Sequence, residues 1–270
     1  MRWLLIAVYL GITLVSALWQ SEFIMKASPI ITVLSLFSIV WLHGTTRYGS
    51  KNIIVFFLIT WIVSNFFEAL SIQTGFPFGY YYYDKLIGPR LFDVPLIIMF
   101  AYFAAGYSSW ILSHIISGHY AEPLKGKQMI VVPVFAALIM VMWDLCMDPL
   151  CSTVASLWVW RNGGAYFGVP LQNYFGWFMV VYIIYQLVAL YLAKCSKLEE
   201  RKKNILNAKL FWLEIVAVYF ILGLTQWLQY WNATSHPEIY GAMALITVFT
   251  MMFVALLSFL KVTESKQLQG

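Results

Sequence analysis

The run NIIVFFLITWIVSNFFEALSI, residues Asn52–Ile72, decides the fold. It is long enough to cross the hydrocarbon core of a bilayer, which takes about 20 apolar residues in an α-helix, and its one acid, Glu68, lies near its end. The whole chain has the same character, because 61% of its 270 residues are hydrophobic, 18% are aromatic and only 11% are charged. This composition is typical of an integral membrane protein, and we expect one domain over residues 1–270.

Apolar runs of similar length recur along the chain and predict an all-α fold, a polytopic transmembrane helical bundle of about eight helices. Seven helices are the alternative, because the second run is short. The first run is expected to be retained rather than cleaved as a signal peptide, since Arg2 alone is a thin basic region and no small-x-small site follows. The expected spans are Trp3–Trp19, Pro29–His43, Asn52–Ile72, Val94–Ser117, Met129–Met147, Pro170–Lys194, Lys209–Trp231 and Ile239–Leu260.

Basic residues predict the orientation. Thirteen of the 17 Lys and Arg fall on the side that carries both chain ends, and four fall on the other. Because Lys and Arg concentrate in cytoplasmic loops, we expect a multi-pass protein of the cell membrane with both termini cytoplasmic. The larger group is Arg2, Arg47, Lys51, Lys125, Lys127, Lys194, Lys197, Arg201, Lys202, Lys203, Lys209, Lys261 and Lys266, and the smaller is Lys26, Lys85, Arg90 and Arg161.

Sequence signals for several other function classes are missing. The three cysteines and four histidines have neither metal-ligand nor disulfide spacing, and no phosphate-binding glycine loop or nucleophile elbow occurs. We therefore predict neither a metal nor a cofactor. Topology explains the net charge of +5, so no nucleic-acid partner is expected. The basic run Lys194–Lys209 is expected to lie beside anionic membrane lipid, and Lys209 or this run to pair with Glu214.

Four carboxylates approach one membrane level on the non-cytoplasmic side. Glu68 and Asp144 lie near the outer ends of their runs, where an ionised acid costs at least a few kcal/mol and usually marks a site or pathway. Asp148 follows Asp144 by four residues, so the two share a helix face if the helix continues to Pro149. Asp93 opens the fourth run. Asp93 and Asp148 also fit plain roles at helix ends, Asp93 as an N-cap.

Two long loops on the same side, Gln73–Asp93 and Asp148–Val169, are rich in aromatic residues, Gly and Pro. Exposing that much aromatic surface to water is costly, so we expect the loops to fold over the helix ends as a lid. Along the extended run Tyr80–Tyr83, side-chain alternation sends Tyr80 and Tyr82 one way and Tyr81 and Tyr83 the other. Such a run also fits an anchoring belt at the membrane interface.

Acids and aromatic rings in one dry pocket predict a particular chemistry. Crowded carboxyl groups in a low dielectric hold at least one proton near neutral pH. A neutral carboxyl group donates that proton, and a desolvated cation over a ring face is stabilised by about 2 kcal/mol or more. The combination suits the protonation of an alkene to a carbocation.

The segments FPFGYYYY, WDLCMDP and WVWRNGGAYFGVPLQNYFGW, together with the apolar runs, resemble the integral-membrane carotenoid biosynthesis proteins, a family that includes carotenoid 1,2-hydratases. The likeness covers Gly75–Trp177 by motif and the rest of the chain by hydropathy. It implies addition of water across the terminal C1–C2 double bond of an acyclic carotenoid, without a redox cofactor. The implied partners are an acyclic carotenoid or other long isoprenoid from the bilayer, water and membrane lipid.

Under this hypothesis Asp144 or Glu68 protonates the alkene, while Asp148 or Asp93, as carboxylate, takes the surplus proton of the attacking water. Asn173 is predicted to hold the water or orient an acid, and Arg161 to set which acid is charged. The predicted catalytic residues are Asp144, Glu68, Asp148 and Asp93, and the predicted substrate-binding residues are Tyr80, Tyr82, Trp143, Trp158, Trp160, Arg161, Tyr166 and Asn173.

Three other functions stay open on the sequence. A membrane-bound terpene or carotenoid cyclase would use the same proton donor and end by losing a proton. A small-molecule or proton-coupled transporter would use Glu68 and Asp144 as a relay. A pigment-binding membrane protein would hold a carotenoid without changing it.

Overall fold

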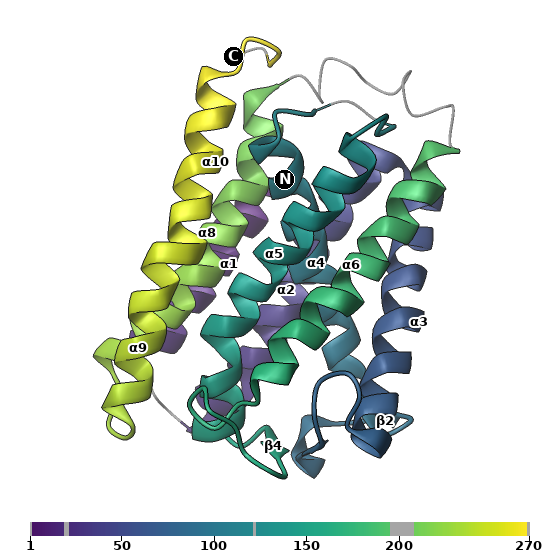
Figure 1. Ribbon diagram of the computed structural model, residues 1–270. Helices are drawn as coiled ribbons and strands as arrows, with labels where there is room; N and C mark the ends of the chain where they lie inside the picture. The colour runs from purple at the N-terminus through teal and green to yellow at the C-terminus, as the bar shows by residue number, and fades with distance from the viewer. Residues whose placement is uncertain (1, 19–21, 121–122, 195–207, 269–270) are drawn as a thin grey trace.

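A computed structural model describes residues 2–18, 22–120, 123–194 and 208–268 of the chain, which form a bundle of long helices (Figure 1). The bundle confirms the predicted all-α, polytopic fold. Its helices are α1 (Arg2–Leu18), α2 (Glu22–Tyr48), α3 (Ser50–Thr74), α4 (Leu96–Ile116), α5 (Gln128–Asp148), α6 (Leu171–Ala193), α8 (Lys209–Trp231), α9 (Pro237–Thr247) and α10 (Phe253–Glu264).

Two helices continue through a π-helical turn. The turn η2 (Pro149–Val154) extends α5, and η4 (Val248–Met252) joins α9 to α10 without a break. Within the described residues, seven helical segments are long and apolar enough to cross a membrane, and α1 is a shorter apolar helix. The chain is therefore a multi-pass membrane protein.

Helix α2 is longer than the sequence predicted. The expected span ended at His43, but the helix continues to Tyr48. The hydroxyls of Thr45 and Thr46 both donate to the carbonyl of Leu42, at 3.0 and 2.9 Å, so these side chains satisfy a backbone acceptor inside the helix instead of ending it. The second run therefore makes a full-length span.

The two long loops pair with each other through short strands at one end of the bundle (Figure 1). Strand β1 (Tyr81–Tyr83) lies antiparallel to β4 (Trp158–Trp160), with Tyr81 opposite Trp160 and Tyr83 opposite Trp158. Next to them, the 3-10 turn η1 (Lys85–Ile87) leads into the hairpin of β2 (Arg90–Leu91) and β3 (Val94–Pro95). These segments form the predicted lid.

Close backbone approaches fix the lid to the helix ends. Gly75 ends α3 in the left-handed conformation, with φ 78°, which costs glycine little. On α6, an atom at the Cβ position of Gly176 would lie 2.8 Å from the carbonyl oxygen of Pro77. The amide nitrogen of Gln172 donates to the carbonyls of Gly75 and Pro77, at 2.9 and 3.0 Å. The first loop is thus held against the start of α6.

The first and last described residues lie at the end of the bundle away from the lid (Figure 1). At this end the side chain of Lys209, the first residue of α8, donates to the carbonyl of Thr263 near the end of α10, at 2.7 Å. The described ends of the chain therefore lie at the end of the bundle that also carries Lys209.

Candidate active site

A cavity of about 50 Å³ lies beneath the lid, among α3, α4, α5 and α6. Three of the four predicted acids line it and are almost fully buried, with Glu68 3%, Asp144 1% and Asp148 1% exposed. Its other walls are mainly aromatic. The full lining is Glu68, Phe78, Tyr81, Tyr83, Ile98, Ala101, Tyr102, Trp143, Asp144, Met147, Asp148, Trp158, Trp160, Asn173 and Trp177.

Glu68 is surrounded by phenol groups. Tyr83 donates to its Oε2 at 2.8 Å, Tyr102 donates to its Oε1 at 2.6 Å, and the hydroxyl of Tyr81 also donates to Oε2. Burial, together with the nearby Glu68 charge, raises the pKa of Tyr81 and Tyr83 well above the ordinary value, so both phenols keep their protons at neutral pH. Three donors on two oxygens suit a carboxylate that only accepts hydrogen bonds.

Asp144 and Asp148 share one amide. The helix continues beyond Asp148, so the two acids lie on one face a turn apart, as predicted. The Nδ2 atom of Asn173 donates to Oδ2 of Asp144 at 2.9 Å and to Oδ2 of Asp148 at 2.8 Å. Asp148 also accepts from the indole nitrogens of Trp158, at 2.7 Å, and Trp160, at 3.4 Å. Asp148 thus receives more hydrogen bonds than Asp144 does.

The aromatic rings form continuous walls around these acids. Tyr102 stacks on Trp177 with ring centres 4.5 Å apart, and Trp143 meets Trp177 edge to face at 6.1 Å. In the lid, Tyr81 packs on Trp160 at 4.9 Å. Because each indole or phenol ring presents negative charge density on its face, the walls favour a positive charge in the cavity.

One buried donor in the cavity wall lacks a protein partner. Among the described residues, the indole nitrogen of Trp143 makes no hydrogen bond, although Trp143 is only 9% exposed. A buried N–H group without a partner costs about 1–3 kcal/mol. The arrangement therefore fits an oxygen atom, from water or from a ligand, next to Trp143.

The predicted alternation of the four tyrosines is confirmed, but the cavity is lined by the other pair. Tyr81 and Tyr83 are buried and line it, whereas Tyr80 and Tyr82 are 42% and 48% exposed and do not. The pairing of β1 with β4 decides the direction, because it sets Tyr81 and Tyr83 opposite Trp160 and Trp158.

Asp93 does not reach the cavity and does not cap α4. With Phe92 it forms the two-residue turn between β2 and β3, where both residues have positive φ, 53° and 65°. These angles match a type I′ turn, whose tip is exposed. Pro95 occupies the N-cap position of α4.

Two further predicted residues lie outside the cavity lining. Arg161 is exposed at the end of β4, and its backbone nitrogen donates to the carbonyl of Tyr80 at 2.9 Å. Tyr166 packs against Tyr174 and donates to the carbonyl of Leu145 at 3.1 Å. Trp143, Trp158, Trp160 and Asn173 line the cavity as predicted.

Sequence reasoning missed several lining residues. Phe78 and Trp177 belong to the quoted segments FPFGYYYY and WVWRNGGAYFGVPLQNYFGW, so their place in the cavity was predictable. Tyr102 was not, because it lies in a long apolar run without an acid. Its hydroxyl, the one polar atom on its ring, was the only signal.

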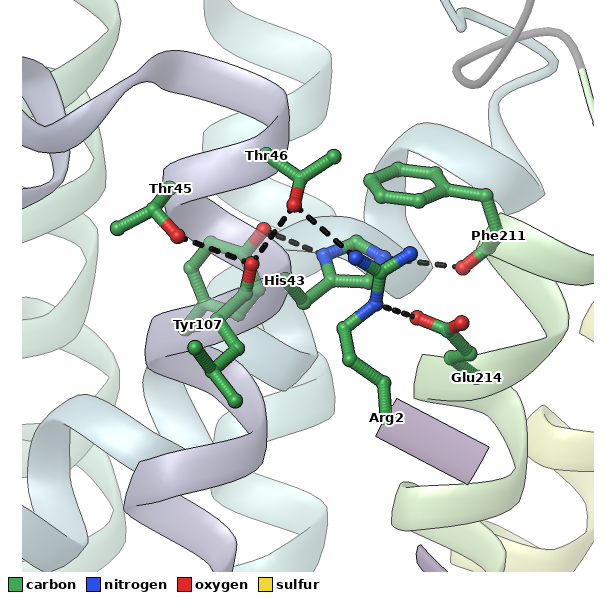
Figure 2. A network of polar contacts seen from close by, with 8 residues as sticks. Arg2, His43, Thr45, Thr46, Tyr107, Phe211 and Glu214 are labelled. Carbon is green, nitrogen blue, oxygen red and sulfur yellow. Dashed lines mark hydrogen bonds and ion pairs between the residues drawn. The ribbon is translucent and has the colours of Figure 1, made fainter. Parts of the chain in front are cut away.

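Glu214 belongs to a separate polar cluster (Figure 2), which includes Arg2 and therefore lies at the end of the bundle away from the lid (Figure 1). Of its two predicted partners, Lys209 is wrong, because Oε2 of Glu214 lies 2.5 Å from Nε of Arg2. The other, the basic run, falls largely on residues 195–207, which lie outside the described residues. Arg2 also donates to the hydroxyl of Thr46 at 3.0 Å. Beside them, His43 hydrogen-bonds to Tyr107 at 2.7 Å and to the carbonyl of Phe211 at 3.0 Å. This cluster joins α1, α2, α4 and α8.

The fold and the cavity define a class of protein: a multi-pass membrane protein with a buried site of carboxyl groups and aromatic rings beneath a lid at one end of the bundle. The sequence profile of the carotenoid biosynthesis protein family matches residues 28–260. The chain belongs to this family.

A characterised relative gives a more specific comparison. Over 113 residues, 42% of this chain, the sequence is 27% identical to bisanhydrobacterioruberin hydratase of Haloarcula japonica. The match covers 36% of that protein, so the chain spans about a third of the relative's length. No solved structure matches this chain significantly.

Proposed function

We propose that this membrane protein is a cofactor-independent carotenoid 1,2-hydratase, which adds water across the terminal double bond of an acyclic carotenoid. The observation that carries the proposal is the cluster of three buried carboxyl groups, unequally hydrogen-bonded, inside an aromatic cavity. The carotenoid biosynthesis family, and the relative that is named as a hydratase, support the same class of reaction.

Asp144 is the proton donor in this proposal. Glu68 accepts three phenol hydrogen bonds, and Asp148 accepts two indole bonds and one amide bond. Among the described residues, Asp144 has a single side-chain donor, the amide of Asn173. Since hydrogen-bond donors stabilise the charged form of an acid, Asp144 is the acid that keeps its proton while its neighbours are charged.

The reaction then runs in two steps. The Asp144 proton passes to C2 of the terminal alkene, and the positive charge at the tertiary carbon C1 is stabilised by the surrounding ring faces. The oxygen of a water molecule, held by the indole N–H of Trp143, bonds to C1. The surplus proton of this water goes to Asp148. It then returns to Asp144, which lies one helical turn away on the same face of α5. The net change is the addition of one water.

The carotenoid enters from the bilayer between α4 and α5. Most residues around the cavity are buried, but Ile98 and Ala101 of α4 and Met147 of α5 are half-buried apolar residues that also line it. A polyene dissolved in the membrane core reaches this side without crossing water. The terminal double bond of the carotenoid, where water is added, lies toward the lid.

The mass of the product tests the proposal. The chain is expressed in a host that accumulates acyclic carotenoids, and the extracted pigments are analysed by mass spectrometry. A carotenoid heavier by one water is expected. A product of unchanged mass and altered chromatographic retention would replace hydration with cyclisation, and unaltered pigment would overturn an enzymatic role on these carotenoids.

A further inference from the structure

A second hollow lies on the outer side of the lid. It is an open groove of about 410 Å³, much larger than the buried cavity. The exposed side chains of Thr74, Asn162 and Gln172 supply hydroxyl and amide groups to its walls, and the exposed rings of Phe76 and Tyr80 border it. The full lining is Thr74, Gly75, Phe76, Gly79, Tyr80, Asn162, Gly163, Pro170 and Gln172. Polar groups of this kind hold water.

The groove and the cavity share a thin wall, which Gly79 and the ring of Trp160 form together. Gly79 lines the groove and Trp160 lines the cavity, and an atom at the Cβ position of Gly79 would lie 3.4 Å from the ring of Trp160. Two consecutive residues of α6 also lie on opposite sides of this wall, because Gln172 lines the groove and Asn173 lines the cavity. The two hollows therefore lie back to back at the ring of Trp160.

Asp148 lies directly behind this wall. Trp160 donates to its Oδ1 at 3.4 Å, a longer and weaker bond than the 2.7 Å bond from Trp158. The hydrogen bond from Trp160 to Asp148 is thus the weaker of the two. A water molecule that passes Trp160 arrives next to the carboxylate that takes a proton in the proposed reaction.

We infer that the groove is the water inlet of the enzyme and that Trp160 separates it from the cavity. Water collects at Thr74, Asn162 and Gln172, passes between Gly79 and Trp160, and reaches Asp148 and Trp143. The carotenoid and the water thus enter by different routes. This inference rests on the proposed hydration.

Filling the groove tests the inlet. Asn162 is exposed in a turn, so Asn162→Trp adds a bulky ring to the groove without burying a new group in the core. Asn162→Ala leaves the groove open at the same position. Ala165→Trp adds the same ring at an exposed lid residue that lines neither hollow.

The first measurement does not depend on catalysis. Hydroxyl radicals generated from water by an X-ray pulse oxidise side chains that contact water, and peptide mass spectrometry then gives the oxidation rate of Trp143. Asn162→Trp is expected to lower this rate several-fold relative to the wild type and both control variants. Trp231, which is exposed at the end of α8 and lines neither hollow, is the internal reference. Equal oxidation of Trp143 in all four proteins would overturn the inlet.

The second measurement follows the fate of the cation. When water is delayed, the cation loses a proton and returns to an alkene, so turnover in D₂O places deuterium in carotenoid that has not been hydrated. The ratio of deuterated carotenoid to alcohol is expected to rise several-fold in Asn162→Trp only. If the ratio is unchanged but the alcohol is formed, the inlet is overturned and the proposed hydratase is supported. A wild type that forms no alcohol would overturn the proposed function, and the oxidation of Trp143 would still test the inlet.

Discussion

At the scale of single residues, the site depends on unequal hydrogen bonding to similar acids. Asp144 and Asp148 lie one helical turn apart and share the amide of Asn173, but only Asp148 also accepts from Trp158 and Trp160. In the proposed mechanism, this difference in partners, rather than in residue type, assigns one acid to donate a proton and the other to accept one.

Asp144→Asn removes the proposed donor and keeps the side-chain shape. Turnover is expected to fall by about 10²–10⁴-fold, the usual contribution of a positioned acid, while the protein stays folded in the membrane. Pigment analysis measures the loss, and the elution volume of the purified protein in detergent serves as the control for folding. An active Asp144→Asn protein would move the donor role to Glu68 or end the proposed mechanism.

Trp158 and Trp160 offer a matched pair of substitutions. Trp158→Phe keeps a ring in the wall but removes the 2.7 Å bond to Asp148. A hydrogen bond to a charged group contributes about 1.5–3 kcal/mol, so turnover is expected to fall roughly 10- to 100-fold. Trp160→Phe removes a 3.4 Å bond and is expected to have a smaller effect. Equal rates for the two variants would contradict the proposed role of these bonds.

The sequence predicted the acids that line the cavity better than it predicted the other lining residues. Glu68 and Asp144 were found because charges inside apolar runs are costly and therefore informative, and Asp148 was found because it follows Asp144 by four residues. Asp93 was misplaced because its position just before an apolar run reads as a helix start, whereas it lies in a tight turn. Tyr102 was missed because a tyrosine in an apolar run carries no comparable cost.

At the scale of secondary-structure elements, the lid depends on a pairing between loops that are far apart in the chain. The alternation in Tyr80–Tyr83 follows from strand geometry and was predictable. The partner strand was not, because β1 and β4 are separated by two transmembrane helices. Which tyrosine pair faces inward is decided by that long-range pairing.

The contact between α6 and the first lid loop is testable by glycine substitution. Gly176→Ala places a methyl group 2.8 Å from the Pro77 carbonyl oxygen, and such overpacking typically costs about 1–3 kcal/mol. We expect a lower melting temperature in detergent. Gly11→Ala in α1 is the control, because no atom lies within 4 Å of the added methyl group. A melting temperature as high as that of the wild type in Gly176→Ala would contradict this packing.

At the scale of the whole molecule, we propose that the end carrying both chain termini faces the cytoplasm and the lid faces the opposite side. The asymmetry of Lys and Arg in the sequence supports this orientation. The basic run Lys194–Lys209 carries much of the signal, although residues 195–207, with Lys202, lie outside the described residues. The helical bundle itself was predictable from the length and number of the apolar runs.

Cysteine labelling in intact cells tests the orientation. Arg161→Cys in the lid is expected to react with a membrane-impermeant maleimide from outside. Lys127→Cys, in the loop before α5, is expected to react only after the cells are opened. Both positions are exposed, so differences in burial do not confuse the comparison. The reverse pattern would place the lid and the cavity on the cytoplasmic side.

The most direct test of the account follows the oxygen atom of water. Purified protein in lipid is supplied with an acyclic carotenoid in water enriched in oxygen-18, and the product is compared with that of Asp144→Asn. The wild type is expected to form a tertiary alcohol that carries oxygen-18, and the variant to leave the carotenoid unhydrated. A wild-type product without the labelled oxygen, or equal labelling by the variant, would contradict hydration at this carboxylate site.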